Sequence, residues 1–164
     1  MPDHSKPKSA PTRVLFVCLG NICRSPLAEF IVRNRACERG IDGQFIFDSA
    51  GTGDWHIGNQ ADARMLRTAL NRGVDMHSHR AMQVTANNVG EWDRLVAMDD
   101  NNRMDLIDMG ADENKLFMLR QFETDNPNAP VPDPYYGGEQ GFEEVFDIVL
   151  RNADPLLDQL SKSD

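Results

Sequence analysis

The chain has 164 residues, of which 40% are apolar and 26% are charged, a composition typical of one globular domain with a core of its own. Its formal net charge of −9 argues against a general affinity for nucleic acids or anionic membranes, so any anion must be bound by a local field. Three cysteines without a framework spacing do not indicate a disulfide scaffold, and no apolar stretch is long enough to span a membrane.

The first segment, residues 1–12 (MPDHSKPKSAPT), is polar and lacks the apolar stretch of a secretory signal. We expect it to form a flexible tail, followed by a single domain over residues 13–164. Because free cysteines are typical of reducing compartments, we expect the protein to be cytoplasmic.

The domain is predicted to begin with a strand and a helix joined by a short turn. Residues 13–19 (RVLFVCL) are almost all apolar, which indicates a strand covered on both faces. Ser25 is a candidate cap for the following helix, Pro26 suits its first turn, and Gly40 is a candidate stop. The helix carries an apolar stripe that we expect to be buried, made up of Leu27, Phe30, Ile31 and Cys37.

Strands and helices then alternate along the rest of the chain. The further expected strands are 44–51, 92–99 and 115–122. Three further helices are expected. The first covers residues 61–73, and the second begins at a cap formed by Asp99 or Asp100 and runs to about residue 109. The last begins near Glu139 and has Phe142, Val145, Phe146 and Val149 on one face. Four such strand–helix units predict a single α/β domain with a four-stranded parallel sheet, helices on both faces and right-handed crossovers.

The turn between the first strand and the first helix, residues 18–25 (CLGNICRS), has the composition of a phosphate-binding loop. Ligands of open parallel sheets bind at the carboxyl ends of the strands, where the next helix offers free N–H groups. Gly20 lets the backbone approach a ligand closely, and successive N–H groups could form a nest around an anion. Arg24 adds a planar fork that can bind two oxygens of that anion.

Cys18 would lie at the bottom of this loop, beneath the bound anion. A helix N-terminus and a neighbouring arginine favour the thiolate form of a cysteine, and the Ser25 hydroxyl could hydrogen-bond to the sulfur. Such a thiolate is placed for in-line attack on phosphorus. A core cysteine and a surface arginine also occur at this spacing by chance, but the strand before, the Gly-Asn within and the Ser-Pro after favour a site.

The segment VCLGNICRSPLAE (residues 17–29) resembles the signature of the low-molecular-weight protein tyrosine phosphatases. The resemblance covers residues 13 to about 160, because further segments fit in the expected order: DSAGT (48–52), HSHRA (77–81), AMDDNN (97–102) and PDPYYGG (132–138). It implies a four-stranded parallel sheet flanked by helices. It also implies hydrolysis of phosphotyrosine in proteins through a phosphocysteine, with no metal or other cofactor. Phosphate-like anions would then bind in the same loop as inhibitors.

The resemblance assigns Cys18 as nucleophile, Arg24 as the group that binds phosphate and transition state, and Asp133 as general acid and then general base. It implies that the remaining loop residues contact the substrate, namely Leu19, Gly20, Asn21, Ile22, Cys23 and Ser25. An acid at Asp133 suits the chemistry, because a departing aryloxide needs a proton and two prolines stiffen the loop around this residue. Without the family, an Asp-Pro pair indicates only a turn.

Three aromatic residues, Trp55, Tyr135 and Tyr136, are candidates for walls that grip a phenyl ring. A deep pocket with such walls admits phosphotyrosine, whereas a phosphoserine side chain is too short to reach its floor. The alternative for these residues is a half-buried packing role.

The family pattern joins Asn21 and Ser25 to Ser49 and His79 in a hydrogen-bond network that would hold the loop open before substrate binds. One position departs from the pattern. The family usually has a basic or amide residue three positions after this histidine, where this chain has Met82, so we expect the local surface to differ.

Two clusters resemble metal sites at first sight. The acidic run at Asp99 and Asp100 lacks the spacing and the glycine of a calcium-binding EF-hand loop, and we interpret it as helix caps. His77 and His79 have no third ligand nearby in the sequence, so we expect no zinc.

Other functions fit parts of this sequence. An arsenate reductase of the same fold would relay a disulfide to cysteines in the middle of the chain, and none follows Cys37. Family members that act on phosphoarginine have threonine where this chain has Ile22. A sulfurtransferase would have no use for Asp133, and a phosphotyrosine-binding module would need neither Asp133 nor Cys18.

Overall fold

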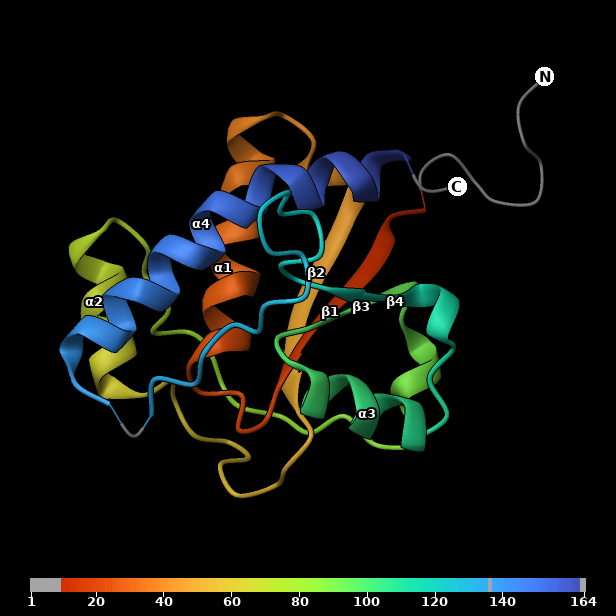
Figure 1. Ribbon diagram of the computed structural model, residues 1–164, viewed down its shortest axis with the longest axis horizontal. Helices are drawn as coiled ribbons and strands as arrows, with labels where there is room; N and C mark the ends of the chain where they lie inside the picture. The colour runs from red at the N-terminus through yellow and green to blue at the C-terminus, as the bar shows by residue number, and fades with distance from the viewer. Residues whose placement is uncertain (1–9, 136, 163–164) are drawn as a thin grey trace.

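Four parallel strands in the order β2-β1-β3-β4 form the centre of the molecule (Figure 1). The computed structural model describes residues 10–135 and 137–162. Its strands are β1 (Thr12–Cys18), β2 (Phe45–Gly51), β3 (Arg94–Ala97) and β4 (Leu116–Met118). β1 pairs with β2 over its whole length, so that Cys18 lies opposite Gly51, and pairs with β3 on its other side. The predicted four-stranded parallel sheet is confirmed.

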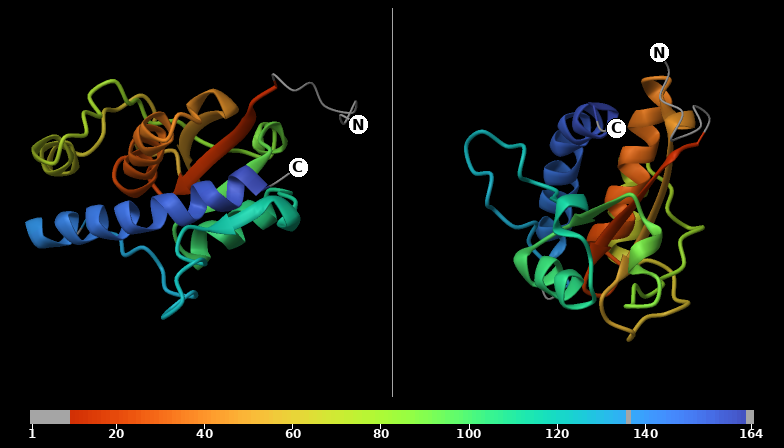
Figure 2. Two further views of the ribbon diagram at one scale, coloured as in Figure 1. Left: turned by 90° about the horizontal axis from the view of Figure 1, so that it is seen from above. Right: turned by 90° about the vertical axis from the view of Figure 1, so that its right-hand side faces the viewer.

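Helices cover both faces of the sheet, as predicted. They are α1 (Arg24–Glu38), α2 (Ala63–Asn71), α3 (Asp100–Asp108) and α4 (Glu139–Lys162). α4 packs against α1 and α2 on one face, and α3 lies on the other (Figures 1 and 2). The side chains of β1 alternate between two cores, with Val14, Phe16 and Cys18 facing α1 and with Leu15 and Val17 facing α3.

α4 buries the apolar stripe that the sequence predicts, because Phe142, Val145, Phe146 and Val149 all belong to the core. Neither α4 nor any other helix of residues 10–135 and 137–162 combines the length and the apolar character needed to cross a membrane. Of the tail that we expect at the N-terminus, residues 1–9 lie outside the described residues, and Thr12 already pairs in β1.

Two expectations for α1 are wrong. Ser25 does not cap the helix, because α1 begins at Arg24 and the Ser25 hydroxyl is turned toward Cys18 and Asn21 instead. Cys37 is exposed rather than buried. Phe30, seven residues earlier on the same side of the helix, is itself only partly buried, so this line of side chains runs along the margin of the buried face, and Ala36 occupies the core position.

β3 and β4 are shorter than the sequence indicates. Trp92 packs in the core on the α3 face before β3 begins, directly after a 3-10 turn at Val89–Glu91. Beyond the strands, single backbone hydrogen bonds join Met98 to Val17 and Leu119 to Ala97 before the chain leaves the sheet. Apolar residues that are buried beside a strand therefore extended the predicted ranges at both ends.

Candidate active site

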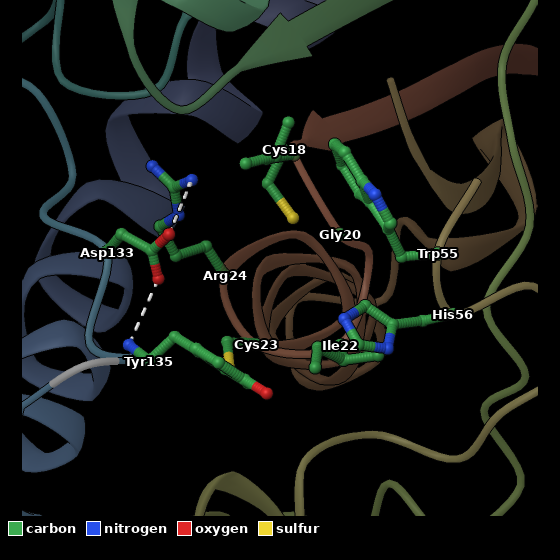
Figure 3. Close-up of a pocket in the computed structure, with 10 residues that line it drawn as sticks. Cys18, Gly20, Ile22, Cys23, Arg24, Trp55, His56, Asp133 and Tyr135 are labelled. Atoms are coloured by element: carbon green, nitrogen blue, oxygen red, sulfur yellow. Dashed lines mark hydrogen bonds and ion pairs between the residues drawn. The ribbon is translucent and has the colours of Figure 1, made fainter. Parts of the chain in front are cut away.

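A pocket of about 370 Å³ opens at the carboxyl end of β1, where residues 18–25, here called the phosphate loop, lead into α1 (Figure 3). This volume is within the range of small-molecule sites. The residues that line it come from three parts of the chain and are Cys18, Leu19, Gly20, Ile22, Cys23, Arg24, Trp55, His56, Asp133 and Tyr135. The topology thus brings the predicted loop, the predicted acid and part of the predicted aromatic rim to one place.

The segment that follows β2 holds the phosphate loop in a tight curve. The backbone N–H groups of Thr52 and Gly53 donate to the carbonyl oxygens of Cys18 and Leu19 at 3.0 and 2.9 Å. A side chain at Gly51 would place its Cβ 2.7 Å from the Leu19 oxygen, so this close approach requires glycine. Within the loop, Asn21 adopts a left-handed backbone with φ 58°, a conformation that asparagine tolerates better than most residues.

The Cys18 sulfur, on a side chain that is buried, lies next to two hydrogen-bonding groups. The backbone N–H of Asn21 donates to it at 3.3 Å, and the Ser25 Oγ lies 3.0 Å away, as predicted for that pair. Hydrogen bonds donated to a sulfur favour its charged form. The loop therefore surrounds Cys18 with groups suited to a thiolate.

Asn21 links the loop to the rest of the site. Its side-chain amide donates to the hydroxyls of Ser25 at 2.8 Å and Ser49 at 3.0 Å, and its side-chain oxygen accepts from the Met82 N–H at 2.9 Å. His79 is buried, and its Nε2 lies 2.7 Å from the Asn21 carbonyl oxygen. Burial lowers the pKa of His79, so the neutral ring donates from Nε2 to that oxygen. These contacts confirm the predicted network of hydrogen bonds.

Glu29, which the sequence reasoning missed, fixes the direction of this network. The Ser49 hydroxyl donates to the Glu29 carboxylate at 2.7 Å, and Arg33 pairs with the same carboxylate. Because the hydroxyl of Ser49 donates its one proton to Glu29, it can only accept a hydrogen bond from Asn21. Ser25 likewise accepts from Asn21. The hydroxyl proton of Ser25 is therefore directed toward the Cys18 sulfur at 3.0 Å or the more distant Ala50 oxygen at 3.5 Å. The sequence does contain a signal for Glu29, because this residue is a single acid within the apolar run LAEFI (residues 27–31).

Arg24 is 3% exposed and is held by acidic partners from two loops. Its Nη1 donates to Asp99 at 2.7 Å and to the Val131 carbonyl at 3.0 Å, and its Nη2 lies 3.7 Å from Asp133. Burial by itself would lower the pKa of Arg24, but Cys18, Asp99 and Asp133 together raise it above its ordinary value. The guanidinium therefore stays charged beside the sulfur.

Asp99 is a helix cap, as interpreted from the sequence, and has a second contact that the sequence did not indicate. One of its oxygens accepts from the Asn102 N–H at the start of α3 in a capping box, and the other accepts from Arg24. The contact with Arg24 joins residues that are 75 positions apart. Sequence spacing alone gives no access to a pair of this kind.

Asp133 lies across the pocket from Trp55 and His56 (Figure 3). It belongs to residues 131–135, here called the acid loop, which is anchored where the Val131 N–H donates to the Met98 carbonyl at 2.8 Å. One Asp133 oxygen accepts from the Tyr135 N–H at 3.0 Å. The side chain is partly exposed, so a proton can reach it from solvent.

The rim combines predicted and unforeseen residues. Trp55 is 67% exposed and Tyr135 is 37% exposed, and both line the pocket, which argues against a packing role for either. His56 was not predicted; its ring lies against Gly20 and its centroid is 6.3 Å from that of Tyr135. Tyr136, the third aromatic candidate, lies outside the described residues.

Cys23, a second cysteine of the phosphate loop, lines the same pocket. Burial, together with the charges of Asp62 and Cys18, raises the pKa of the Cys23 thiol above its ordinary value. Cys23 therefore carries a neutral thiol within the phosphate loop.

Met82 does not disturb the site, although it departs from the family pattern. It contributes its backbone N–H to Asn21, while its own carbonyl accepts from the Gly51 N–H at 2.8 Å. Its side chain is half-buried against the core on the α3 face, so the expected difference is one of packing.

The two histidines that could suggest zinc do not converge. His77 is exposed and bonded to Asp75, whereas His79 is buried against the phosphate loop. Among residues 10–135 and 137–162, no three His, Cys, Asp or Glu side chains gather as a metal site would require.

Known proteins are similar to this chain in both sequence and fold. The family described as "Low molecular weight phosphotyrosine protein phosphatase" matches residues 13–164. A Bacillus subtilis (strain 168) protein, "Low molecular weight protein-tyrosine-phosphatase YfkJ", is 39% identical over 151 residues, which are 91% of this chain and 96% of that protein. The crystal structure of YfkJ superimposes with a TM-score of 0.87 and 36% identity, covering 95% of this chain and 98% of that one.

Two further solved structures bear on the chemistry. The protein tyrosine phosphatase from Entamoeba histolytica with Hepes in the active site has a TM-score of 0.85 and 38% identity, and covers 92% of this chain and 97% of that one. The drosophila arginine phosphatase DARP has a TM-score of 0.81 and 29% identity, with coverage of 92% and 97%.

Proposed function

The chain belongs to the low molecular weight protein-tyrosine-phosphatase family and is therefore a phosphoric monoester hydrolase. From this premise we propose that it hydrolyses phosphotyrosine in proteins through a phosphocysteine, with Cys18, Arg24 and Asp133 as the catalytic residues. The observation that carries the proposal is the pocket itself. It joins a buried cysteine with donors at its sulfur, a buried guanidinium and a carboxyl group on the facing loop.

In the first step, the Cys18 thiolate attacks phosphorus in line with the bond to the phenol oxygen. The S–P bond forms while the P–O bond breaks, and the protonated Asp133 carboxyl gives its proton to the departing oxygen. Arg24 and the N–H groups of the phosphate loop bind the other phosphate oxygens, where charge is spread in the transition state.

In the second step, water attacks the phosphorus of the phosphocysteine. Asp133, now a carboxylate, takes a proton from that water as the S–P bond breaks. Inorganic phosphate leaves and the Cys18 thiolate is restored, so the cycle requires neither a metal nor an external reductant. The same anion site would bind phosphate-like inhibitors, in keeping with the Hepes found in the active site of the Entamoeba histolytica phosphatase.

The rim supports phosphotyrosine rather than phosphoserine as substrate. Trp55 and Tyr135 line the mouth of the pocket, whereas Cys18 lies buried at its base. A phenyl ring spans this depth and contacts the aromatic walls, but a phosphoserine side chain is too short to do so.

A second candidate is a phosphoarginine phosphatase, since the drosophila arginine phosphatase has the same fold. Ile22 favours phosphotyrosine, because its apolar side chain lines the pocket and offers no hydrogen bond to a guanidinium.

We also propose that the enzyme is cytoplasmic, because thiols stay reduced in that compartment.

The proposal is tested by release of phenol and phosphate from phenyl phosphate in the presence of a chelator. Cys18→Ser should abolish turnover but retain phosphate binding, because Arg24 and the loop N–H groups remain. Arg24→Ala should lose both turnover and phosphate binding. Substantial turnover by Cys18→Ser would exclude the phosphocysteine.

A further inference from the structure

The N-terminus of α2 lies between the two loops that form the pocket. Asp62 caps this helix, with its carboxylate accepting from the Arg64 N–H at 2.8 Å. The Asp62 N–H itself donates to the Ile22 carbonyl at 2.9 Å. The start of α2 is therefore fixed to the phosphate loop through the backbone.

Arg64 extends from this anchored turn to the other side of the pocket. Its Nη2 donates to the Tyr135 carbonyl at 3.0 Å, and its guanidinium carbon lies 5.4 Å from the centroid of the Tyr135 ring and 4.7 Å from that of Phe142. Asp62 holds the guanidinium in this position, with Nε to Oδ1 at 3.1 Å and Nη2 to Oδ2 at 2.9 Å. A bidentate pair of this kind restricts the orientation of the fork.

The backbone of Tyr135 connects Arg64 to Asp133. Its N–H donates to Asp133 Oδ1 at 3.0 Å, as Figure 3 shows, while the contact of Asp133 with Arg24 is longer at 3.7 Å. The backbone of Tyr135 thus lies between the Arg64 fork, which donates to its carbonyl, and the Asp133 carboxyl, which accepts from its N–H. Tyr135 follows Asp133 by two residues on a loop with prolines at 132 and 134.

We propose that Arg64 is a positioning residue for Asp133: the Asp62–Arg64 pair joins the phosphate loop to the acid loop and sets the place of the acid relative to Cys18. The proposal rests on the proposed role of Asp133 as general acid. Arg64 does not line the pocket, so it acts through Tyr135 and not on the substrate.

The pair is charged in the folded protein, as this role requires. The hydrogen bond with Asp62 raises the pKa of Arg64. Burial by itself would raise the pKa of Asp62, but the hydrogen bonds from Arg64 lower it below its ordinary value. The link therefore persists throughout the pH range in which the enzyme would act.

The test compares kcat/KM for two aryl phosphates that differ in their need for a proton. Phenyl phosphate releases a strongly basic phenoxide, whereas para-nitrophenyl phosphate releases a nitrophenoxide that leaves without help. Arg64→Met removes the guanidinium, with its donors and its contact with Phe142, and keeps an unbranched apolar side chain. Arg67→Met, on the same helix, is the matched control, because Arg67 is exposed and its ion pair is with Glu139, at 3.7 Å and also exposed.

We expect Arg64→Met to lower kcat/KM for phenyl phosphate about 10- to 100-fold, since small misplacement of a catalytic group has costs of this size. The loss for para-nitrophenyl phosphate in Arg64→Met should be about threefold or less, and the inhibition constant of phosphate should be unchanged in this variant. Arg67→Met should change kcat/KM for neither substrate. Arg64→Lys should show the same selective loss at smaller size, and it supplies the comparison if Arg64→Met does not fold.

In an Asp133→Asn background, Arg64→Met should not alter the ratio of the two substrates any further, because the acid is already absent. Equal losses on both substrates, or a change of ratio that persists without Asp133, would overturn the positioning role. If Asp133→Asn alone leaves the ratio unchanged, it is the general-acid assignment that fails, so the two failures are distinguishable.

Discussion

Cys23 lies in the same pocket as Cys18 but carries a neutral thiol, because burial and nearby charges raise its pKa. Peroxide reacts with thiolates, so in the proposed mechanism, where Cys18 is the thiolate nucleophile, it should convert Cys18 to a sulfenic acid first. Cys23 can then attack that sulfur: the S–S bond forms, the S–O bond breaks, and the thiol proton of Cys23 leaves with the displaced hydroxide as water. We propose that this disulfide protects the nucleophile from further oxidation.

The prediction is that a thiol restores most activity of the peroxide-treated native protein but little activity of Cys23→Ala. Cys37→Ala is the matched control and should recover like the native protein, because Cys37 is exposed on the outside of α1. Recovery is measured as turnover of an aryl phosphate after dithiothreitol treatment. Equal recovery of all three proteins would remove the protective role of Cys23.

Ile22 is the residue that we expect to separate phosphotyrosine from phosphoarginine. Its buried, apolar side chain lines the pocket, so the N–H groups of a guanidinium placed there would go unpaired. An unpaired buried polar group costs about 1–3 kcal/mol, which corresponds to about 5- to 150-fold in rate.

We predict that kcat/KM for phosphotyrosine exceeds that for phosphoarginine by at least this factor, and that Ile22→Thr narrows the gap. Ile57→Thr serves as control, because Ile57 is exposed and does not line the pocket. Comparable kcat/KM values for the two substrates in the unmodified protein would contradict the tyrosine assignment.

At the scale of elements, α1 and β2 are joined beneath the site by Glu29, whose carboxylate binds the Ser49 hydroxyl and Arg33. Glu29→Ala leaves a buried hydroxyl without its acceptor and frees Ser49 to rotate. We predict a loss of about 1–3 kcal/mol in the free energy of unfolding, the usual cost of an unsatisfied buried group, together with a lower kcat/KM. Urea denaturation and aryl phosphate kinetics measure the two effects.

Glu38→Ala is the control for this prediction, because Glu38 lies on the same helix, is largely exposed and pairs with Arg35 at the surface. Exposed pairs of this kind contribute only about 0–1 kcal/mol. If the two variants lose the same stability and activity, Glu29 has no special part in the network.

The elements nearest to each other in the chain were the most predictable. The β1–loop–α1 unit could be predicted because its chemistry is local: an apolar strand, a glycine, two cysteines and an arginine within one turn. The limits of β3 and β4 could not, because Trp92 and Leu119 are buried without lying within the strands. Burial and strand pairing produce the same apolar pattern.

Long-range contacts between elements were beyond the sequence. Arg24 meets Asp99 75 positions away, and Arg64 meets Tyr135 71 positions away. Periodicity assigns a side chain to a face of a helix, but it does not say which charged partner stands opposite once the sheet has brought the elements together. The family resemblance supplied Asp133, whereas His56 and Arg64 became visible only in the folded protein.

At the scale of the whole molecule, His79 and Glu123 are among the groups that make the fold sensitive to acid. Burial lowers the pKa of His79, so this group stabilises the fold fully above its unfolded pKa of about 6.5 and less as the pH falls below it. Glu123, in the segment after β4, accepts hydrogen bonds from Arg120 of the same segment and from Asn152 of α4, and these bonds lower its pKa to about 2. Its contribution is present above about pH 4.5 and is lost between there and pH 2.

We therefore predict that the free energy of unfolding falls as the pH drops below about 6.5 and falls further below about 4.5. Glu123→Gln should cost about 1.5–3 kcal/mol at pH 7, the range for hydrogen bonds to a charged group, and the difference from the native protein should shrink toward pH 2. Chemical denaturation at a series of pH values measures this. A difference that is constant over the whole range would show that the charge of Glu123 is not involved.

The central claim is that phosphate passes from tyrosine to water by way of the Cys18 sulfur. Rapid acid quench during turnover of a phosphorus-labelled phosphotyrosine peptide, followed by peptide mapping, tests this claim most directly. We predict an S-phosphorylated Cys18 that is absent in Cys18→Ser and that does not appear at Cys23 or Cys37. Turnover of the peptide with no label on Cys18, or with label on another residue, would contradict it.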